Sequence, residues 1–432
     1  MRRWARPTRL GLALLLSLGA CGTTEGREPP PSAAKPDPAP TLEGTWRATL
    51  TSPGGELPFE LHVHDREGTL QATAHNGTET VEFTSVSLGG DTAVLRIDGY
   101  DSEVRATLKD DGQSLWGVWT KTTPDGPSSM PFAATRGAQP RFSSETPAPS
   151  YDVPKSVDGE WSVRFREEDD STFVGHAILT SSDGALHGTI LTDTGDYRYL
   201  EGRYANGTVE LSCFDGGHAF LFRATVAEDG SLEGNFWSRA SYHATWTATP
   251  MSPGQASPLA DPFTAVTLSS RETEGRFRFA FPDSSGATVT DEDPRFRDKV
   301  VLIDIFGTWC PNCNDYAPVL ARWHDTYGPR GLEIVGLAFE FTGDVKRDRA
   351  QLATYAQTHG ITFPLLLAGT SDKGDAAELL PSIDEVKSYP TTILVGRDGR
   401  VHKIHSGFAG PATGKHHERL LNTLQTEIES LL

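Results

Sequence analysis

A Cys-Pro-Asn-Cys segment, Cys310 to Cys313, is the feature that most constrains what this chain can fold into. It follows a nearly continuous apolar run at 300–306, which is typical of a strand buried on both faces. A helical stripe of apolar residues that includes Trp323 comes after it. A helix that begins at Cys310 stabilises a thiolate there, because its first backbone N–H groups are unpaired. Since one helical turn brings the two sulfurs together, the segment predicts a redox-active dithiol at a strand–helix junction.

Two other interpretations of this pair are a structural disulfide and half of a four-cysteine zinc site. The chain holds four cysteines, and the other two, Cys21 and Cys213, stand alone in the sequence. No second pair therefore completes a zinc site, and four cysteines are too few for a disulfide-stapled scaffold. A structural bridge would not need to be exposed beside Trp309. These considerations favour dithiol chemistry.

The surrounding residues, 264–432, alternate between strand-like and helix-like patterns. Such alternation, with a hairpin near the end, predicts an α/β sandwich around a mixed sheet. We expect strands at 276–281, 300–306, 332–339 and 363–368, a hairpin at 391–395 and 400–406, and helices after Cys313, at 344–359 and through Leu420 to Leu431.

Three motifs stand out in this region: Asp-Ile-Phe-Gly-Thr-Trp-Cys-Pro-Asn-Cys at 304–313, Ser-Tyr-Pro-Thr-Thr at 388–392, and Gly-Arg-Asp-Gly at 396–399. With these motifs the region resembles the thioredoxin fold and, within it, the TlpA/ResA-like thiol-disulfide oxidoreductases. The resemblance implies that Pro390 follows a cis peptide bond and faces the dithiol, with Tyr389 offering its backbone to the substrate. Together with Trp309, this loop is expected to form an apolar docking surface for the substrate.

Two carboxylates join the candidate catalytic residues through the same resemblance. Asp304 stands where thioredoxin has a buried carboxylate, which would have a raised pKa and relay a proton to or from Cys313. The lysine that accompanies it in thioredoxin is not matched, since Gly336 or Leu337 falls near its place. Glu340 lies near the acidic residue of ResA-like members. The alternative for Glu340 is a solvated residue at the end of a strand.

The first half of the chain contains a repeated β pattern with a spacing of about 115 residues. Each copy starts with a Gly-x-Trp triplet, at 44–46 and at 159–161. Each also carries a late Asp-Gly segment that ends in Trp, at 111–119 and at 229–237. Short alternating runs separated by Gly and Asn turns lie between these landmarks. The pattern predicts antiparallel hairpins, about eight strands in each copy, enough to close a small barrel.

The Gly-x-Trp on each first strand resembles the calycin (lipocalin and avidin) barrels, over 42–136 and 157–249. The fold class expected is therefore two antiparallel β-barrel repeats followed by an α/β thioredoxin-fold domain at 264–432. Such a barrel is a ligand cup or a filled barrel that serves as spacer or docking surface, and we favour the filled barrel. His62 and His64 share a strand face without a third metal ligand, so we expect no metal. Cys213 is expected to be a buried apolar residue.

The N-terminus carries the pattern of an export signal. Residues 1–20 combine four arginines with a short apolar run, too short to span a bilayer. The run ends at Leu-Gly-Ala-Cys, which resembles the lipobox of bacterial lipoproteins and implies that Cys21 is the lipid anchor. The rest of 21–41 is a Pro-rich tether. By the same resemblance, Gly22 favours the outer membrane, facing the periplasm.

The overall charge limits the classes of partner. The formal net charge is −19, with 39 basic against 58 acidic residues. A surface this acidic is a poor match for nucleic acid. No cofactor is expected.

The function expected is that of a membrane-tethered thiol-disulfide oxidoreductase acting on cysteines of exported proteins, most naturally as a reductant. Kinship with the TlpA-like proteins implies a membrane thiol-electron transporter of the DsbD/CcdA kind as its electron source. Two alternatives stay open. One is a peroxiredoxin-like peroxidase, although Thr308 stands two residues before Cys310 and not three. The other is a ligand- or partner-binding barrel protein with an accessory redox domain.

Overall fold

The computed structural model describes residues 41–143, 147 and 149–432. The expected signal segment, Cys21 and nearly all of the Pro-rich tether lie outside these residues. Among the described residues, no helix combines the length and apolarity needed to cross a membrane.

The first β unit is an open nine-stranded antiparallel sheet, with the strands in the order β4-β3-β2-β1-β9-β8-β7-β6-β5. The prediction of a closed barrel is wrong for this unit. Strands β4 and β5 follow each other in the chain, but Phe83 and Thr84 between them donate backbone hydrogen bonds to Ala72 and Arg96 instead of forming a hairpin turn. Both strands therefore remain edges of a half-barrel. The strands are β1 (Gly44–Ser52), β2 (Gly55–Arg66), β3 (Thr69–Asn76), β4 (Glu79–Glu82), β5 (Ser85–Gly89), β6 (Thr92–Ile97), β7 (Ser102–Lys109), β8 (Ser114–Thr123) and β9 (Gly126–Arg136).

The second β unit is a closed eight-stranded antiparallel barrel, as predicted. Pairing of β11 with β12 closes the ring, and the short β13 is attached to β12. Aromatic side chains fill the interior: Phe222 stacks on Phe236 with ring centroids 4.3 Å apart, and Phe165 and Trp246 lie in the same cluster. The strands are β10 (Gly159–Glu167), β11 (Thr172–Ser182), β12 (Ala185–Thr192), β13 (Gly195–Asp196), β14 (Leu200–Ala205), β15 (Thr208–Phe214), β16 (Ala219–Val226), β17 (Leu232–Ser238) and β18 (Tyr242–Pro250).

The two Gly-x-Trp tryptophans make the same contact in both units. Trp46 and Trp161 are buried on the first strand of their sheets. Each indole N–H donates to a carbonyl four residues earlier, of Leu42 and of Val157, at 2.9 Å in both cases. The sequence repeat is therefore also a repeat of local structure.

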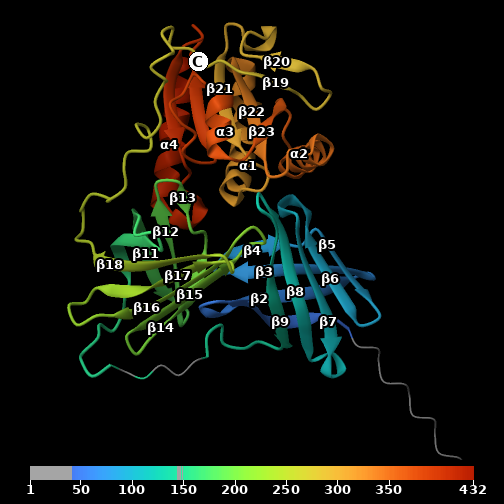
Figure 1. The fold of residues 1–432 in the computed structure, drawn as a ribbon, viewed down its shortest axis with the longest axis vertical. Helices are drawn as coiled ribbons and strands as arrows, with labels where there is room; N and C mark the ends of the chain where they lie inside the picture. Colours follow the sequence, from blue (N-terminus) through green and yellow to red (C-terminus); the bar gives the residue numbers. More distant parts are fainter. Residues whose placement is uncertain (1–40, 144–146, 148) are drawn as a thin grey trace, which may run out of the picture. The chain divides into compact units, whose positions relative to one another are not determined.

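The C-terminal domain is built on a five-stranded mixed sheet in the order β23-β22-β21-β24-β25, with the last two strands antiparallel to their neighbours. Helices α1 and α4 pack with Leu302 and Ile334 on one face, while α2 and α3 belong to the cluster around Ile303 and Ile305 (Figure 1). The mixed α/β sandwich is confirmed. Its elements are β21 (Val300–Phe306), α1 (Pro311–Tyr327), β22 (Leu332–Glu340), α2 (Val345–His359), β23 (Leu365–Thr370), α3 (Lys373–Leu379), β24 (Thr391–Val395), β25 (Val401–Ser406) and α4 (Lys415–Leu431).

The predicted strand at 276–281 is largely wrong. Only β19 (Ala280–Pro282) is a strand there, paired with β20 (Thr288–Thr290). The alternation of Phe277 and Phe279 reflects burial of both rings in the core. The backbone bonds elsewhere, since the Arg278 N–H donates to the Ser382 hydroxyl. Helix α3 was not predicted.

Candidate functional site

The dithiol lies at the start of α1, where β21 ends. Cys310 is the N-cap residue, and its Sγ accepts a hydrogen bond from the backbone N–H of Cys313 at 3.3 Å. Pro311 occupies the first helical turn, where its missing N–H costs no bond. Both cysteines are free thiols in this structure, with Cys310 6% exposed and Cys313 1% exposed. The predicted strand–helix junction is confirmed.

The Tyr389–Pro390 loop meets the dithiol from the other side. The Tyr389–Pro390 peptide bond is cis, as the resemblance implied. The Cys310 thiol lies 3.5 Å from the Tyr389 carbonyl oxygen and donates to it. Residues far apart in the sequence therefore converge on the Cys310 sulfur.

Trp309, the residue before Cys310, packs between the end of β22 and the Tyr389–Pro390 loop. Its indole N–H donates to the Phe339 carbonyl at 2.8 Å, and its ring stacks on Phe341 with centroids 4.4 Å apart. The Tyr389 ring meets it edge-on at 5.5 Å. Trp309 is half-buried, while Tyr389 and Pro390 are buried. The three residues are gathered at one place, but little of their surface faces solvent, and their role in docking stays a prediction.

Asp304 is a buried carboxylate on β21. It is 3% exposed, and its Oδ1 has no hydrogen-bond partner among the described residues. Burial raises the pKa of Asp304 to about 8. The residue opposite it on β22 is Gly336, so that strand offers no cation to it. Burial also raises the pKa of Cys313, with contributions from Cys310 and from the Asp304 charge.

Glu340 is not a solvated residue at the end of a strand. It is buried, and its two carboxylate oxygens accept hydrogen bonds from the Thr308 backbone N–H at 2.9 Å and from the Thr308 hydroxyl at 2.7 Å. Burial raises the pKa of Glu340 to about 7, and the Asp348 charge adds to the effect. Glu340 thus holds the backbone two residues before Cys310.

Three further side chains hold the dithiol segment, and none was predicted. The Asn314 amide donates to the carbonyls of Thr308 and Cys310, both at 2.9 Å. His359 on α2 lies 2.8 Å from the Asn314 side-chain oxygen, and the Tyr355 hydroxyl donates to the Cys313 carbonyl at 2.9 Å. Asn314 directly follows the Cys-Pro-Asn-Cys segment, so its position in the sequence could have indicated a role in holding this segment. The two α2 residues carry no signal in the sequence.

Two turns of the closed barrel cover the residues between the cysteines. Gly217 packs on Pro311, and a Cβ at position 217 would lie 2.8 Å from the Pro311 Cγ. Gly195, on β13, approaches the Asn312 side chain so closely that a Cβ there would overlap its amide nitrogen. Only glycine fits at such contacts. The barrel therefore contributes to the burial of the dithiol segment.

The half-barrel contributes a buried cation, Lys121, next to one of these two turns. Lys121, on β8, donates from its ammonium to the Gly217 carbonyl at 2.8 Å. The ammonium also lies 5.8 Å from the centroid of the Phe341 ring that stacks on Trp309. Burial lowers the pKa of Lys121 to about 8, against the opposing charges of Asp215 and Cys310. Lys121 therefore belongs to the electrostatic surroundings of the dithiol.

A buried ion cluster centred on Arg198 fixes the barrel to α1. The guanidinium lies 2.6 Å from a Glu79 oxygen and 3.3 Å from an Asp215 oxygen. It also forms an ion pair with Asp315, on the first turns of α1. The cluster joins the half-barrel, the closed barrel and the helix that carries Cys313.

The other residues singled out from the sequence lie away from this site. Cys213 is fully buried in β15, and burial raises the pKa of its thiol. His62 pairs with Glu60, and its ring lies 6.1 Å from that of His64. Cys21 is outside the described residues.

The comparisons with known proteins agree with this geometry. Residues 276–404 match the AhpC/TSA family. The thioredoxin-like protein YneN of Bacillus subtilis is 32% identical over 129 residues, which cover 29% of this chain and 69% of that protein. The thiol-disulfide oxidoreductase ResA of the same organism is 26% identical over 129 residues, covering 30% of this chain and 64% of ResA.

Among solved structures, a thiol:disulfide interchange protein DsbE from Chlorobium tepidum aligns with 35% of this chain and 96% of its own, at 22% identity and a TM-score of 0.27. The family match, at 276–404, lies within the domain that carries the Cys-Pro-Asn-Cys dithiol. Through that domain the chain belongs to the AhpC/TSA family of thioredoxin-like proteins and is a thiol-disulfide oxidoreductase related to ResA.

Proposed function

We propose that this protein reduces disulfides of exported proteins, with Cys310 as the attacking thiol. The observation that carries the proposal is the position of the Cys310 sulfur, which contacts both the Cys313 N–H at the start of α1 and the Tyr389 carbonyl. Helix N–H groups favour a thiolate over a thiol at this position. A substrate disulfide that docks along the Tyr389–Pro390 loop would place one sulfur in line with Cys310.

The reaction proceeds in two exchange steps. The Cys310 thiolate attacks one substrate sulfur, the substrate disulfide breaks, and its other sulfur leaves as a thiolate and takes up a proton. Cys313 then attacks the Cys310 sulfur, which releases the second substrate thiol. The substrate gains two electrons and two protons, and Cys310 and Cys313 form a disulfide.

Asp304 and Glu340 have different parts in this scheme. Cys313 must lose its proton before it attacks, and the nearby unpartnered Asp304 carboxylate is the group suited to accept it. Glu340 does not touch the sulfurs; it acts through Thr308 as a positioning residue for the Cys310 backbone.

The barrel cover has a consequence for substrates. Because Gly217 and Gly195 lie against the residues between the cysteines, a protein substrate has to displace these turns to reach Cys310. Trp309 and Tyr389 are the apolar surface it would then meet. We propose that the barrels, whether or not they are calycin relatives, control which substrates gain access.

The pattern of the N-terminal residues supports a proposal for where the protein is located. We propose that Cys21 carries the lipid, that 22–41 is the tether, and that the protein faces the periplasm from the outer membrane. A membrane thiol-electron transporter would return electrons to the oxidised pair. Metabolic labelling with a radioactive fatty acid, in the native chain and in Cys21→Ala, tests the anchor: label that persists in the variant would exclude it.

Trapping tests the central proposal. In Cys313→Ser the first exchange step is intact and the second is blocked, so a mixed disulfide with insulin should accumulate at Cys310. Mass spectrometry of the trapped peptide identifies the cysteine. Trapping at Cys213, or none at all, would overturn the proposal.

Two further measurements separate the alternatives. Rapid consumption of hydrogen peroxide with insulin left untouched would favour a peroxidase. The reduction potential of the Cys310–Cys313 couple sets the direction: a reductant should lie closer to thioredoxin, about −270 mV, than to the oxidant DsbA, about −120 mV.

A further inference from the structure

Three side chains from separate elements meet where the closed barrel approaches α4. Glu160 lies on β10, His176 on β11 and His416 in the first turn of α4. One ligand atom from each lies within 4.8 Å of the other two. Their positions in the sequence are far apart, which is why the sequence carried no sign of the cluster and no metal was expected.

His176 is held in the orientation that metal ligation requires. It is 2% exposed, and its Nε2 lies 3.0 Å from a Glu160 oxygen. Its Nδ1 lies 3.1 Å from the Ser257 hydroxyl. Ligating histidines are commonly oriented by a hydrogen bond from the other ring nitrogen. Without metal, the Nε2–H donates to the Glu160 carboxylate and Nδ1 accepts from the Ser257 hydroxyl. A metal ion bound between Nε2 and Glu160 would replace this proton, and the Nδ1–H would then donate to Ser257.

His416 completes the set from the thioredoxin-fold domain. Its ring meets the His176 ring edge-on, with centroids 5.1 Å apart. Neither of its nitrogens makes a hydrogen bond within the part of the chain that the structure describes. Metal binding at His416 therefore displaces no hydrogen bond of the described residues.

We propose that Glu160, His176 and His416 form a binding site for a divalent transition metal of the Zn²⁺ class. Two imidazole nitrogens and one carboxylate are a ligand set that zinc accepts, with water in the fourth position. The side chains have to draw slightly together, because zinc ligand bonds are about 2.0–2.2 Å long. The half-exposed Glu160 and the first turn of α4 have room for this movement.

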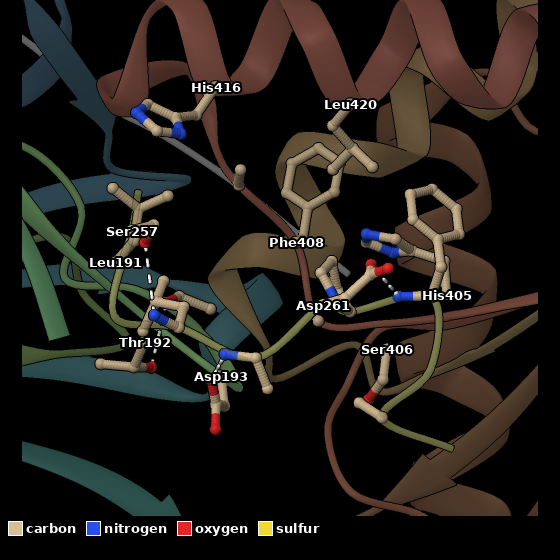
Figure 2. Close-up of a pocket in the computed structure, with 18 of the residues that line it drawn as sticks. Leu191, Thr192, Asp193, Ser257, Asp261, His405, Ser406, Phe408, His416 and Leu420 are labelled. Carbon is tan, nitrogen blue, oxygen red and sulfur yellow. Dashed lines mark hydrogen bonds between the residues drawn. The ribbon is translucent and has the colours of Figure 1, made fainter. Parts of the chain in front are cut away.

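Space for the fourth ligand exists beside the cluster. A pocket of about 310 Å³ lies between the barrel, the 257–265 segment, the end of β25 and α4. Figure 2 shows His416 and Ser257 at one end of this pocket, with His405 and Asp261 at the other. Water bound to the metal would face the pocket at the His416 end.

The site would join the barrel to the thioredoxin-fold domain. Two of its ligands come from barrel strands and the third from α4. The same barrel places Gly195 and Gly217 over the dithiol segment. Bound metal would therefore stabilise the contact of these barrel turns with the dithiol segment, and we expect it to slow alkylation of Cys310.

Zinc titration by calorimetry tests the site. Because thiolates also bind zinc, the titration uses the full chain with Cys310→Ser and Cys313→Ser. We expect one Zn²⁺ per chain, with affinity reduced at least about tenfold in Glu160→Gln and more in His416→Gln. His402→Gln is the matched control, because His402 also pairs with a glutamate, Glu427, at the surface.

X-ray absorption of the zinc-loaded double-serine chain gives a second readout. Only nitrogen and oxygen ligands, about two of them imidazoles, are expected. Absence of stoichiometric binding at micromolar Zn²⁺ would overturn the proposal. Equal affinity in His416→Gln and His402→Gln would overturn it as well. Neither outcome bears on insulin reduction, so the proposed disulfide chemistry is tested separately.

Discussion

The closed barrel and the thioredoxin-fold domain both bury ionisable side chains, but they treat them differently. In the barrel, the Arg198 guanidinium is surrounded by three carboxylates, of Glu79, Asp215 and Asp315. In the thioredoxin-fold domain, Asp304 is as deeply buried and its Oδ1 has no partner among the described residues. A buried carboxyl group without a partner is costly to ionise, which supports the role that we propose for Asp304 beside the dithiol.

The buried cysteines of the two regions also differ in their polar contacts. Cys213 is fully buried within a barrel strand among apolar side chains. Cys310 is nearly as buried but stands at a helix N-terminus, with its sulfur in contact with the Cys313 N–H and the Tyr389 carbonyl. The two thiols therefore differ in the polar contacts of the sulfur and not in burial, which supports the proposal that Cys310 is reactive and Cys213 inert.

The largest expected effect is that of removing the reactive thiol. Cys310→Ser should lower insulin reduction by at least about a thousandfold, since a hydroxyl cannot replace the thiolate in the first exchange step. Turbidity of precipitating insulin chains is the assay, with the single variant compared to the native chain. Activity close to native in Cys310→Ser would mean that Cys310 is not the attacking thiol and that it does not differ from Cys213 in reactivity.

Breaking the Arg198 cluster is expected to have the next largest effect. Arg198→Met removes the guanidinium that pairs with Glu79, Asp215 and Asp315. Of these carboxylates, only Asp215 keeps another ion pair among the described residues, with His218. Removal of one partner from a buried ion pair costs about 3–5 kcal/mol. Denaturant unfolding, followed by tryptophan fluorescence, measures the loss of stability. Arg96→Met is the control, because Arg96 pairs with Glu103 at the surface, where an ion pair adds little to stability.

The same variant should also loosen the barrel from α1, because Arg198 pairs with Asp315. Alkylation of Cys310 is then expected to be faster in Arg198→Met than in Arg96→Met. Equal stability and equal labelling rates in the two variants would mean that the cluster contributes nothing to the cover.

Asp304→Asn should have the opposite effect on stability. Burial raises the pKa of Asp304 to about 8 in the folded chain, whereas an unfolded chain titrates near 4. Between these values the folded state holds a proton that the unfolded state has lost, so the free energy of unfolding falls as pH rises. In Asp304→Asn the free energy of unfolding does not decrease in this way. The variant should therefore be more stable than the native chain at pH 7, by on the order of 2–4 kcal/mol.

Unfolding midpoints at pH 4, 7 and 9 test this point. The advantage of Asp304→Asn over the native chain should be absent at pH 4 and greatest at pH 9. In the insulin assay, the native rate should rise through about pH 8 and the variant should lack that rise. A variant whose stability and rate follow the native pH profiles would show that Asp304 does not titrate in this range.

The sequence predicted the dithiol region more completely than its surroundings. The apolar run of β21, the proline after Cys310 and the second motif at Pro390 are local patterns, and the structure has each of them where expected. Local patterns also predicted two barrels, but closure of the first depends on how Phe83 and Thr84 bond between two edge strands.

Local sequence patterns also could not predict that turns of the barrel lie against the dithiol segment. Gly195 and Gly217 look like ordinary turn glycines in the sequence, and only the fold brings them against Asn312 and Pro311. Glu340 was placed near the site by resemblance alone, and its contact with Thr308 depends on adjacent parallel strands.

The smallest expected effect is that of Cys213→Ser. The thiol lies in an apolar cluster, so a hydroxyl there is less well accommodated and should cost about 1 kcal/mol of stability. Insulin reduction should stay within about twofold of the native rate, because Cys213 takes part in no step of the exchange. Paired measurements of unfolding and activity in this variant and in Cys310→Ser sharpen the contrast: one loses mainly stability and the other mainly activity. A substantial loss of activity in Cys213→Ser would mean that the barrel thiol exchanges with the dithiol, and that the division between an inert and a reactive cysteine is wrong.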